Sequence, residues 1–320
     1  MLSKLRSNKL WAVLSKRYSP KKDLENFKPK AMSNKTIQEL GYIFNDNGQL
    51  RKIGEDGQPT EEPFQFNISD VHRECQDHYE ELGHAVTKHI YHLLETEVNL
   101  TRLPVPKDAE PNLGTFIFVS EDYDKKDVLM VLIHGLGAVR AGQWARSLII
   151  NECIDMGTQI PYIKKALEKD YGVMVLNTND NYQEDGTKKP STGTNEEHAC
   201  YVWDTYISNT NASSIVIVAH SYGGVVTVAL ANEMKEDFEK RVKAIAFTDS
   251  VHYFSEIPLT DFMKKVAKNW VATTSPLDTP IKTADYDITR VSAGHPKHEM
   301  TSYTSFESVF KFVEEMLTKT

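Results

Sequence analysis

The chain has 320 residues, of which 40% are hydrophobic and 26% are charged, and its formal net charge is −8. This length and apolar content suffice for the core of one large domain, and the negative charge excludes an overall basic field, so we expect no direct contact with nucleic acid. No apolar run approaches the roughly 18 residues that a membrane span needs, so we expect no membrane contact either.

Cysteine usage is sparse: Cys75, Cys153 and Cys200 are isolated from one another in the sequence. Their spacing fits neither a disulfide framework nor a zinc site. We therefore expect a reducing compartment, no metal and no cofactor.

The first residues are compositionally distinct from the rest. Residues 1–30 carry nine Lys or Arg against Asp23 and Glu25, a net of 9 − 2 = +7. We predict a basic, flexible N-terminal segment over residues 1–36, followed by a single domain over residues 37–320. A mitochondrial presequence and a nuclear-import patch are the alternatives for this segment.

The ordered part begins with a hairpin pattern. Apolar runs at 42–44 and 50–53 flank an Asn-Gly dipeptide, which supplies the positive φ angles of a tight turn. Apolar residues then recur at helical spacing over 69–97, which predicts one long amphipathic helix.

Beyond a proline-rich linker at 103–111, short apolar runs alternate with helical segments. The runs predict strands, and they occupy residues 115–119, 128–133, 172–176, 214–219 and 242–247. The helical segments between them occupy residues 146–150, 160–168, 196–208 and 224–238, and residues 183–195 read as a surface loop. Continuous apolar strands separated by helices predict an α/β fold with a mostly parallel central sheet covered by helices on both faces.

A nucleophile elbow follows the strand at 214–219. The sequence there reads Ala219-His220-Ser221-Tyr222-Gly223-Gly224, with small residues two before and two after the serine. Strand, sharp turn and helix in this order predict an α/β-hydrolase fold with Ser221 as the nucleophile. The alternative is a serine that merely caps the helix.

Oxyanion donors are expected from two places. The strand at 128–133 runs into His134-Gly135-Leu136-Gly137, where this fold carries its oxyanion loop. Backbone N–H groups of Gly135 and Leu136, together with that of Tyr222, are the candidates.

The order of the triad in this fold is serine, acid, histidine. His252, His295 and His298 follow Ser221, and a last strand predicted at 289–293 favours His295 or His298. We expect Nε2 of the base to lie about 2.6–3.2 Å from the serine hydroxyl, or somewhat further away when no substrate is bound. Asp249 follows the strand at 242–247, and Asp278 comes after a possible strand at 269–272. Chain order slightly favours Asp278 and the clearer strand end favours Asp249, so the choice between these acids stays open.

Six sequence blocks resemble the Argonaute-binding-protein-two domain family, and more closely its animal cotranscriptional-regulator branch. They lie at residues 131–135, 140–146, 157–161, 219–224, 248–252 and 291–294. The resemblance extends over residues 37–317, and the block Arg-Ala-Gly-Gln-Trp-Ala-Arg at 140–146 is its most specific part. In the family pattern, Val-Ser-Ala-Gly is followed by a His-Glu pair, which selects His298 over His295 as the base.

The resemblance implies a nuclear and cytoplasmic protein that associates with an Argonaute-type protein and a chromatin-remodelling factor and influences alternative splicing. It leads to an adapter hypothesis, in which a hydrolase-derived scaffold bridges these partners. The alternative is a serine esterase or amidase that acts on a small acyl substrate through Ser221. The sequence decides neither whether the serine is active nor the oligomeric state.

Overall fold

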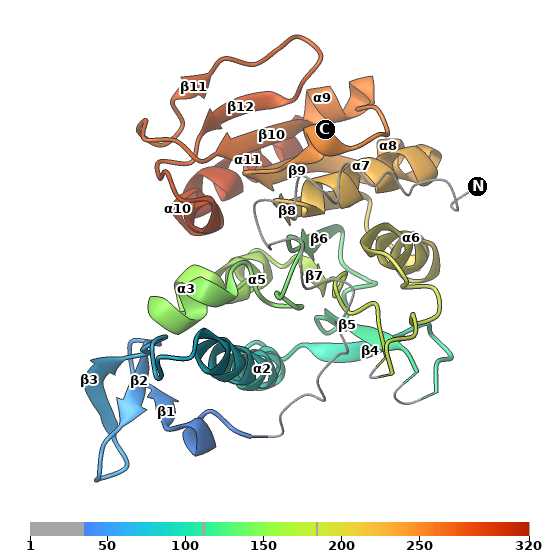
Figure 1. The fold of residues 1–320 in the computed structure, drawn as a ribbon. Helices are drawn as coiled ribbons and strands as arrows, with labels where there is room; N and C mark the ends of the chain where they lie inside the picture. Colours follow the sequence, from blue (N-terminus) through green and yellow to red (C-terminus); the bar gives the residue numbers. More distant parts are fainter. Residues whose placement is uncertain (1–34, 111–112, 184, 320) are drawn as a thin grey trace.

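The computed structural model describes residues 35–110, 113–183 and 185–319 (Figure 1). Residues 1–34 of the expected basic segment lie outside the described part. Among the described residues, nine strands form the central sheet in the order β11-β12-β10-β9-β8-β6-β7-β5-β4. Their bounds are β4 (Thr101–Val105), β5 (Thr115–Val119), β6 (Val128–Ile133), β7 (Gly172–Val175), β8 (Ser214–His220), β9 (Val242–Thr248), β10 (Ala267–Val271), β11 (Pro280–Ile281) and β12 (Thr289–Ser292).

The predicted α/β-hydrolase fold is confirmed. Strands β7, β6, β8, β9, β10 and β12 pair in parallel in that order across the sheet. Strands β4 and β5 are antiparallel at one edge, and the short β11 is antiparallel at the other. With parallel strands, the carboxyl ends of β6, β8, β9 and β12 meet at one edge of the sheet, where such folds carry their sites.

Helices cover both faces of this sheet, as Figure 1 shows. Alternate residues of β6 explain the continuous apolar run: Met130 and Leu132 enter one core, whereas Val131 enters the other. The first core packs against α2 (His72–Thr96), α3 (Arg146–Asn151), α5 (Ile160–Glu168) and α11 (Phe306–Thr318). The second core packs against α6 (Asn195–Thr205), α7 (Gly223–Glu233), α8 (Lys235–Arg241) and α9 (Asp261–Val266).

The N-terminal part of the domain contains the predicted hairpin and the predicted long helix α2. Strands β1 (Tyr42–Phe44) and β2 (Leu50–Ile53) pair antiparallel. A third strand, β3 (Pro59–Pro63), extends them into a small sheet that the sequence pattern did not reveal. Within the described residues, no helix combines the length and the apolar character that crossing a bilayer requires.

The expected linker at 103–111 is partly wrong, because β4 occupies its first residues. Pro104 lies opposite Phe116 in the antiparallel pair with β5. Proline has no N–H to donate and is therefore tolerated in an edge strand, which has a hydrogen-bonded partner strand on one side alone. Strand β4 is such an edge strand.

The most specific family block, residues 140–146, is joined by main-chain hydrogen bonds to the block at 157–161, and we call these two bonded segments the clasp. The N–H groups of Trp144 and Ala145 donate to the carbonyl of Gly157 at 2.8 and 3.0 Å, and the Gln159 N–H donates to the Gly142 carbonyl at 2.8 Å. Gly157 ends α4 (Ile154–Gly157) and is buried. The blocks at 140–146 and 157–161 thus hold each other by main-chain bonds.

Arg146 fastens this clasp to the long helix α2. Its guanidinium lies 4.8 Å over the Tyr79 ring and forms an ion pair with Glu80 at 3.0 Å. The arginine stem packs on Gly83, where an added Cβ would lie 2.9 Å from the arginine Cδ. The family block therefore has an evident structural role.

We expect Gly157→Ala to lower the free energy of unfolding by about 2–3 kcal/mol, since an added methyl group has no room and overpacking carries costs of this size. Its Cβ would lie 2.4 Å from Ile149 Cγ1 and 2.7 Å from the Ala145 carbonyl oxygen. Gly57→Ala is the matched control: its φ is +77° but nothing lies within 4 Å, so only about 1 kcal/mol of backbone strain is expected. Urea unfolding of both variants measures the difference, and equal losses would contradict the clasp.

Candidate active site

Ser221 occupies the predicted elbow between β8 and α7. Its φ is +54°, the strained conformation in which such a turn presents its side chain. The glycines after it are required by close approach: a Cβ on Gly223 would lie 2.7 Å from the Ile133 carbonyl oxygen, and one on Gly224 would lie 1.7 Å from Ser250 Oγ. Ser221 is 9% exposed, so access to it is narrow.

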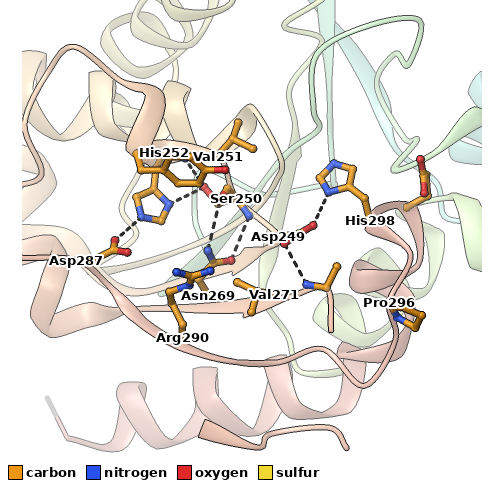
Figure 2. A pocket seen from close by; sticks show the side chains of 13 residues that line it. Asp249, Ser250, Val251, His252, Asn269, Val271, Asp287, Arg290, Pro296 and His298 are labelled. Atoms are coloured by element: carbon orange, nitrogen blue, oxygen red, sulfur yellow. Dashed lines mark hydrogen bonds and ion pairs between the residues drawn. The ribbon is translucent and has the colours of Figure 1, made fainter. Parts of the chain in front are cut away.

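A carboxylate and an imidazole meet directly beside this elbow. His298 lies in the 3-10 helix η6 (His298–Met300), and its Nδ1 is 2.6 Å from Asp249 Oδ2 (Figure 2). The other oxygen, Asp249 Oδ1, accepts a hydrogen bond from the Ala272 N–H at 3.0 Å. Burial alone would raise the pKa of Asp249, but the hydrogen bonds from His298 and Ala272 outweigh it and the pKa is lowered. Asp249 is therefore held as a carboxylate that orients the imidazole.

Asp278, the other candidate acid, is engaged elsewhere. It accepts hydrogen bonds from Trp270 Nε1 at 2.8 Å and from Ser308 Oγ at 2.6 Å. It thereby links the end of β10 to α11. The structure brings Asp249, and not Asp278, to His298, because β9 adjoins β8 whereas β10 is one strand further from the elbow.

Ser221 Oγ makes no hydrogen bond to any residue within the described ranges. The direct bond between this hydroxyl and His298 is therefore not formed in this structure. Catalytic hydrogen bonds are often long in a ligand-free site and shorten when substrate binds. The roles of Ser221 and His298 in catalysis stay predictions.

The expected oxyanion loop lies against the serine. A Cβ on Gly135 would be 3.0 Å from Ser221 Cβ, closer than such atoms normally approach, so glycine at this position lets the loop lie directly against the serine. The Gly135 carbonyl is turned toward His134 Nδ1 at 2.8 Å and Asn179 Nδ2 at 2.9 Å. The N–H groups of Leu136 and Tyr222 donate to nothing in the part of the chain that the structure describes, which leaves both available to a developing oxyanion.

Sequence reasoning missed the polar residues that fix this loop. Asn179 also donates to the Val139 carbonyl at 3.0 Å, and its own oxygen accepts from Asn195 Nδ2 at 2.7 Å. Tyr222 donates its hydroxyl to Glu196 at 2.7 Å. Asn195 is the last residue of the expected surface loop at 183–195. The sequence signal that could have revealed Asn179 is the polar run after the carboxyl end of β7.

Three buried histidines surround the loop and the elbow. Burial is the largest cause that lowers the pKa of His134 to about 4, and of His198 and His220 to about 3. The ring of His220 lies 4.6 Å from that of His298, centre to centre. These imidazoles are neutral at physiological pH, so His298 has an uncharged neighbour.

A cavity of about 470 Å³ adjoins the Asp249–His298 pair, and Figure 2 shows its lining. Ser221 is not among the residues that line it. Across the described ranges, no group of three or more histidine, cysteine or acidic side chains is arranged to hold a metal ion.

We expect the free energy of unfolding to decrease as the pH falls below about 6.5. The unfolded chain takes up protons at His134, His198 and His220 near that pH, whereas the folded chain resists them until the pH approaches 4 to 3. The contribution of these histidines to the free energy of unfolding is therefore complete above their pKa in the unfolded chain. It is lost on acidification, by up to about 1.4 kcal/mol per pH unit for each histidine.

Urea titrations at pH 7, 6 and 5 measure this dependence. His198→Gln removes one of the three groups, so the slope of unfolding free energy against pH should fall by about the contribution of one proton. An unchanged slope in that variant would show that His198 is not the buried neutral group described above.

Comparison with known proteins places these features in a family. A family model described as the Arb2 domain matches residues 33–277. The cotranscriptional regulator ARB2A of Mus musculus is 41% identical to this chain over 88% of it and 80% of the relative. A homologue of ARB2A from Dictyostelium discoideum is 35% identical over 89% of this chain and 81% of its own.

Two solved structures share the fold at low sequence identity. A histone deacetylase structure from Saccharomyces cerevisiae aligns with a TM-score of 0.51 over 73% of this chain and 97% of that chain, at 16% identity. The histone deacetylase Clr3 aligns with a TM-score of 0.50 over 81% of this chain and 42% of its own, at 15% identity. The sequence matches are far stronger, and by them the chain belongs to the Arb2 domain family, which includes the cotranscriptional regulators.

Proposed function

We propose that the protein is a cotranscriptional regulator that acts as an adapter, linking an Argonaute-type protein and a chromatin-remodelling factor to alternative splicing. The observation that carries this proposal is the 41% identity to a cotranscriptional regulator over 88% of the chain, which spans the whole domain and not the elbow alone. An adapter works through its surface, and this role needs the fold to be intact but not Ser221 to react. The proposal implies a protein of the nucleus and cytoplasm.

A second function, serine esterase or amidase on a small acyl substrate, is favoured by the site geometry. Asp249 holds His298 at 2.6 Å, and Ser221 stands on a strained turn with two N–H groups nearby that donate to no described residue. In this function, Ser221 Oγ attacks the acyl carbon while His298 takes its proton. The proton passes to the leaving group, and water then releases the acid by the same steps in reverse. The two functions are compatible.

The first test addresses the reaction. We expect a fluorophosphonate probe to label the tryptic peptide 189–235, which contains Ser221, and the label on this peptide to vanish in Ser221→Ala. Asp249→Asn should slow that labelling by a factor on the order of 10³, because the imidazole loses its orienting carboxylate. Asp278→Asn, which alters the contacts to Trp270 and Ser308 only, should slow it far less.

Mass spectrometry of the digest locates the label, and thermal melts show whether each variant is folded. Equal effects of the two aspartate variants would mean that Asp249 does not orient the base. A wild-type protein without label on this peptide would rule out the esterase function as stated.

The second test addresses the adapter. We expect Ser221→Ala to retain its association with Argonaute, since the hydroxyl is one small group in a cleft and its loss should cost less than about 1 kcal/mol of stability. Gly223→Val should lose association through misfolding, because its side chain would meet the Ile133 carbonyl oxygen at 2.7 Å. Co-precipitation with melting curves measures both. A folded Ser221→Ala protein that loses its partners would contradict an adapter that is independent of the serine.

A further inference from the structure

A second set of serine, histidine and aspartate side chains lies next to the first. Ser250 Oγ is 2.9 Å from His252 Nδ1, and His252 Nε2 is 2.8 Å from Asp287 Oδ1 (Figure 2). Ser250 and His252 follow β9 directly, and Asp287 precedes β12. All three line the cavity of about 470 Å³, which Ser221 does not line.

We propose that Ser250 is a second nucleophile of this protein, which takes an acyl group from a small uncharged ester bound in the cavity. The hydrogen-bonded chain Ser250–His252–Asp287 is complete in this structure, whereas Ser221 Oγ is bonded to nothing in the described residues. Both the serine and its base line the same cavity, where Ser250 is 4% and His252 2% exposed.

The proton positions in this chain suit a general base. The Asp287 carboxylate can only accept, so His252 Nε2 carries the hydrogen in this bond, and in the tautomer with the hydrogen on Nε2 alone, Nδ1 accepts from the Ser250 hydroxyl. Burial would raise the pKa of Asp287, but the hydrogen bonds from His252 and from the Ile288 N–H lower it. The side chain of His252 is only 1% exposed, which fixes the ring in this orientation.

Two positive groups can stabilise charge on Ser250 Oγ and on the acyl oxygen. Ser250 Oγ packs against Gly224 in the first turn of α7, so closely that a Cβ there would lie at 1.7 Å. The N-terminus of an 11-residue helix carries partial positive charge. Arg290 also lines the cavity, and its positive charge helps to lower the pKa of Asp287. In the proposed step, this guanidinium supplies positive charge to the side of the cavity in which the oxyanion forms.

The step balances within these groups. Ser250 Oγ forms a bond to the ester carbon as its proton moves to His252 Nδ1, and collapse of the adduct breaks the bond to the alkoxide, which leaves as the alcohol with that proton. Water then attacks the acyl-serine, again deprotonated by His252, and releases the carboxylic acid.

Size and charge define the substrate class. A cavity of about 470 Å³ admits a small molecule but no large acyl chain. The carboxylates of Asp249, Asp287 and Glu299 also line it, against the single guanidinium of Arg290, so an anionic ester is disfavoured. A short, neutral ester such as p-nitrophenyl acetate is the matching probe.

The decisive experiment separates the two serines by digestion of the full chain. Trypsin places Ser250 in peptide 244–264 and Ser221 in peptide 189–235. After reaction with a fluorophosphonate, we expect label on 244–264 in the wild type, and at least half of it retained in folded Ser221→Ala. Ser250→Ala should remove it, whereas Ser255→Ala, a neighbouring serine in the same peptide, should not.

His252→Gln distinguishes a reactive serine from one that merely supports the turn. This variant keeps Ser250 but lacks the general base, so labelling of peptide 244–264 should slow at least 100-fold. In a Ser221→Ala background, where ester hydrolysis is assigned to Ser250, the release of p-nitrophenol should slow by the same factor. Rates unchanged in a folded His252→Gln protein would overturn the proposal. So would an unlabelled 244–264 peptide, and this outcome is independent of whether Ser221 reacts.

Discussion

Two histidine relays, Asp249–His298 and Asp287–His252–Ser250, lie beside the elbow. Both depend on the contact between the Ser221 backbone and the turn that follows β9. The Ser221 N–H donates to the Thr248 carbonyl at 3.1 Å, and the Ser221 carbonyl accepts from the Val251 N–H at 3.1 Å. Ser221 and Asp249 both have positive φ, a conformation that costs free energy and persists only where surrounding bonds impose it. Each strained turn is thus held by the other, and the serine and the acid are fixed relative to one another before any side chain makes contact.

The turn of four residues at 249–252 consequently contributes side chains to both relays. Asp249 is bonded to His298, whereas His252 is bonded to Ser250 and Asp287, and both groups line the same cavity (Figure 2). The Ser250 N–H donates to Asn269 Oδ1 at 3.1 Å, which ties the turn to β10 as well. Because the two imidazole relays share this backbone, a substitution in one is expected to shift the geometry of the other, and their effects should not be additive.

Local sequence pattern predicted most of the helices and strands, but it did not predict the contacts between them. The strand runs were predictable because both faces of a parallel sheet are buried, and the elbow because small residues flank Ser221. Strand β4 was hidden by Pro104, which local rules assign to a linker. The choice between Asp249 and Asp278 could not be made, since each follows a strand with a positive φ and only the order of strands in space decides which one meets His298. The distant partner Asp287 lies 35 residues beyond His252 and leaves no local signal.

The family block and the chemistry are related through packing and not through shared residues. The clasp at 140–146 binds α3 to α2 and contributes no residue to either relay, yet the rings of Trp144 and His220 pack edge to face with their centres 6.3 Å apart. His220 in turn packs 4.6 Å from His298. The buried imidazole of His220 is neutral and therefore gives His298 an uncharged neighbour, whereas a charged ring at this place would oppose the protonation of His298. The family block therefore supports the site through the contact of Trp144 with His220, the neighbour of the base. A fold retained for binding partners would keep this contact whether or not Ser221 reacts.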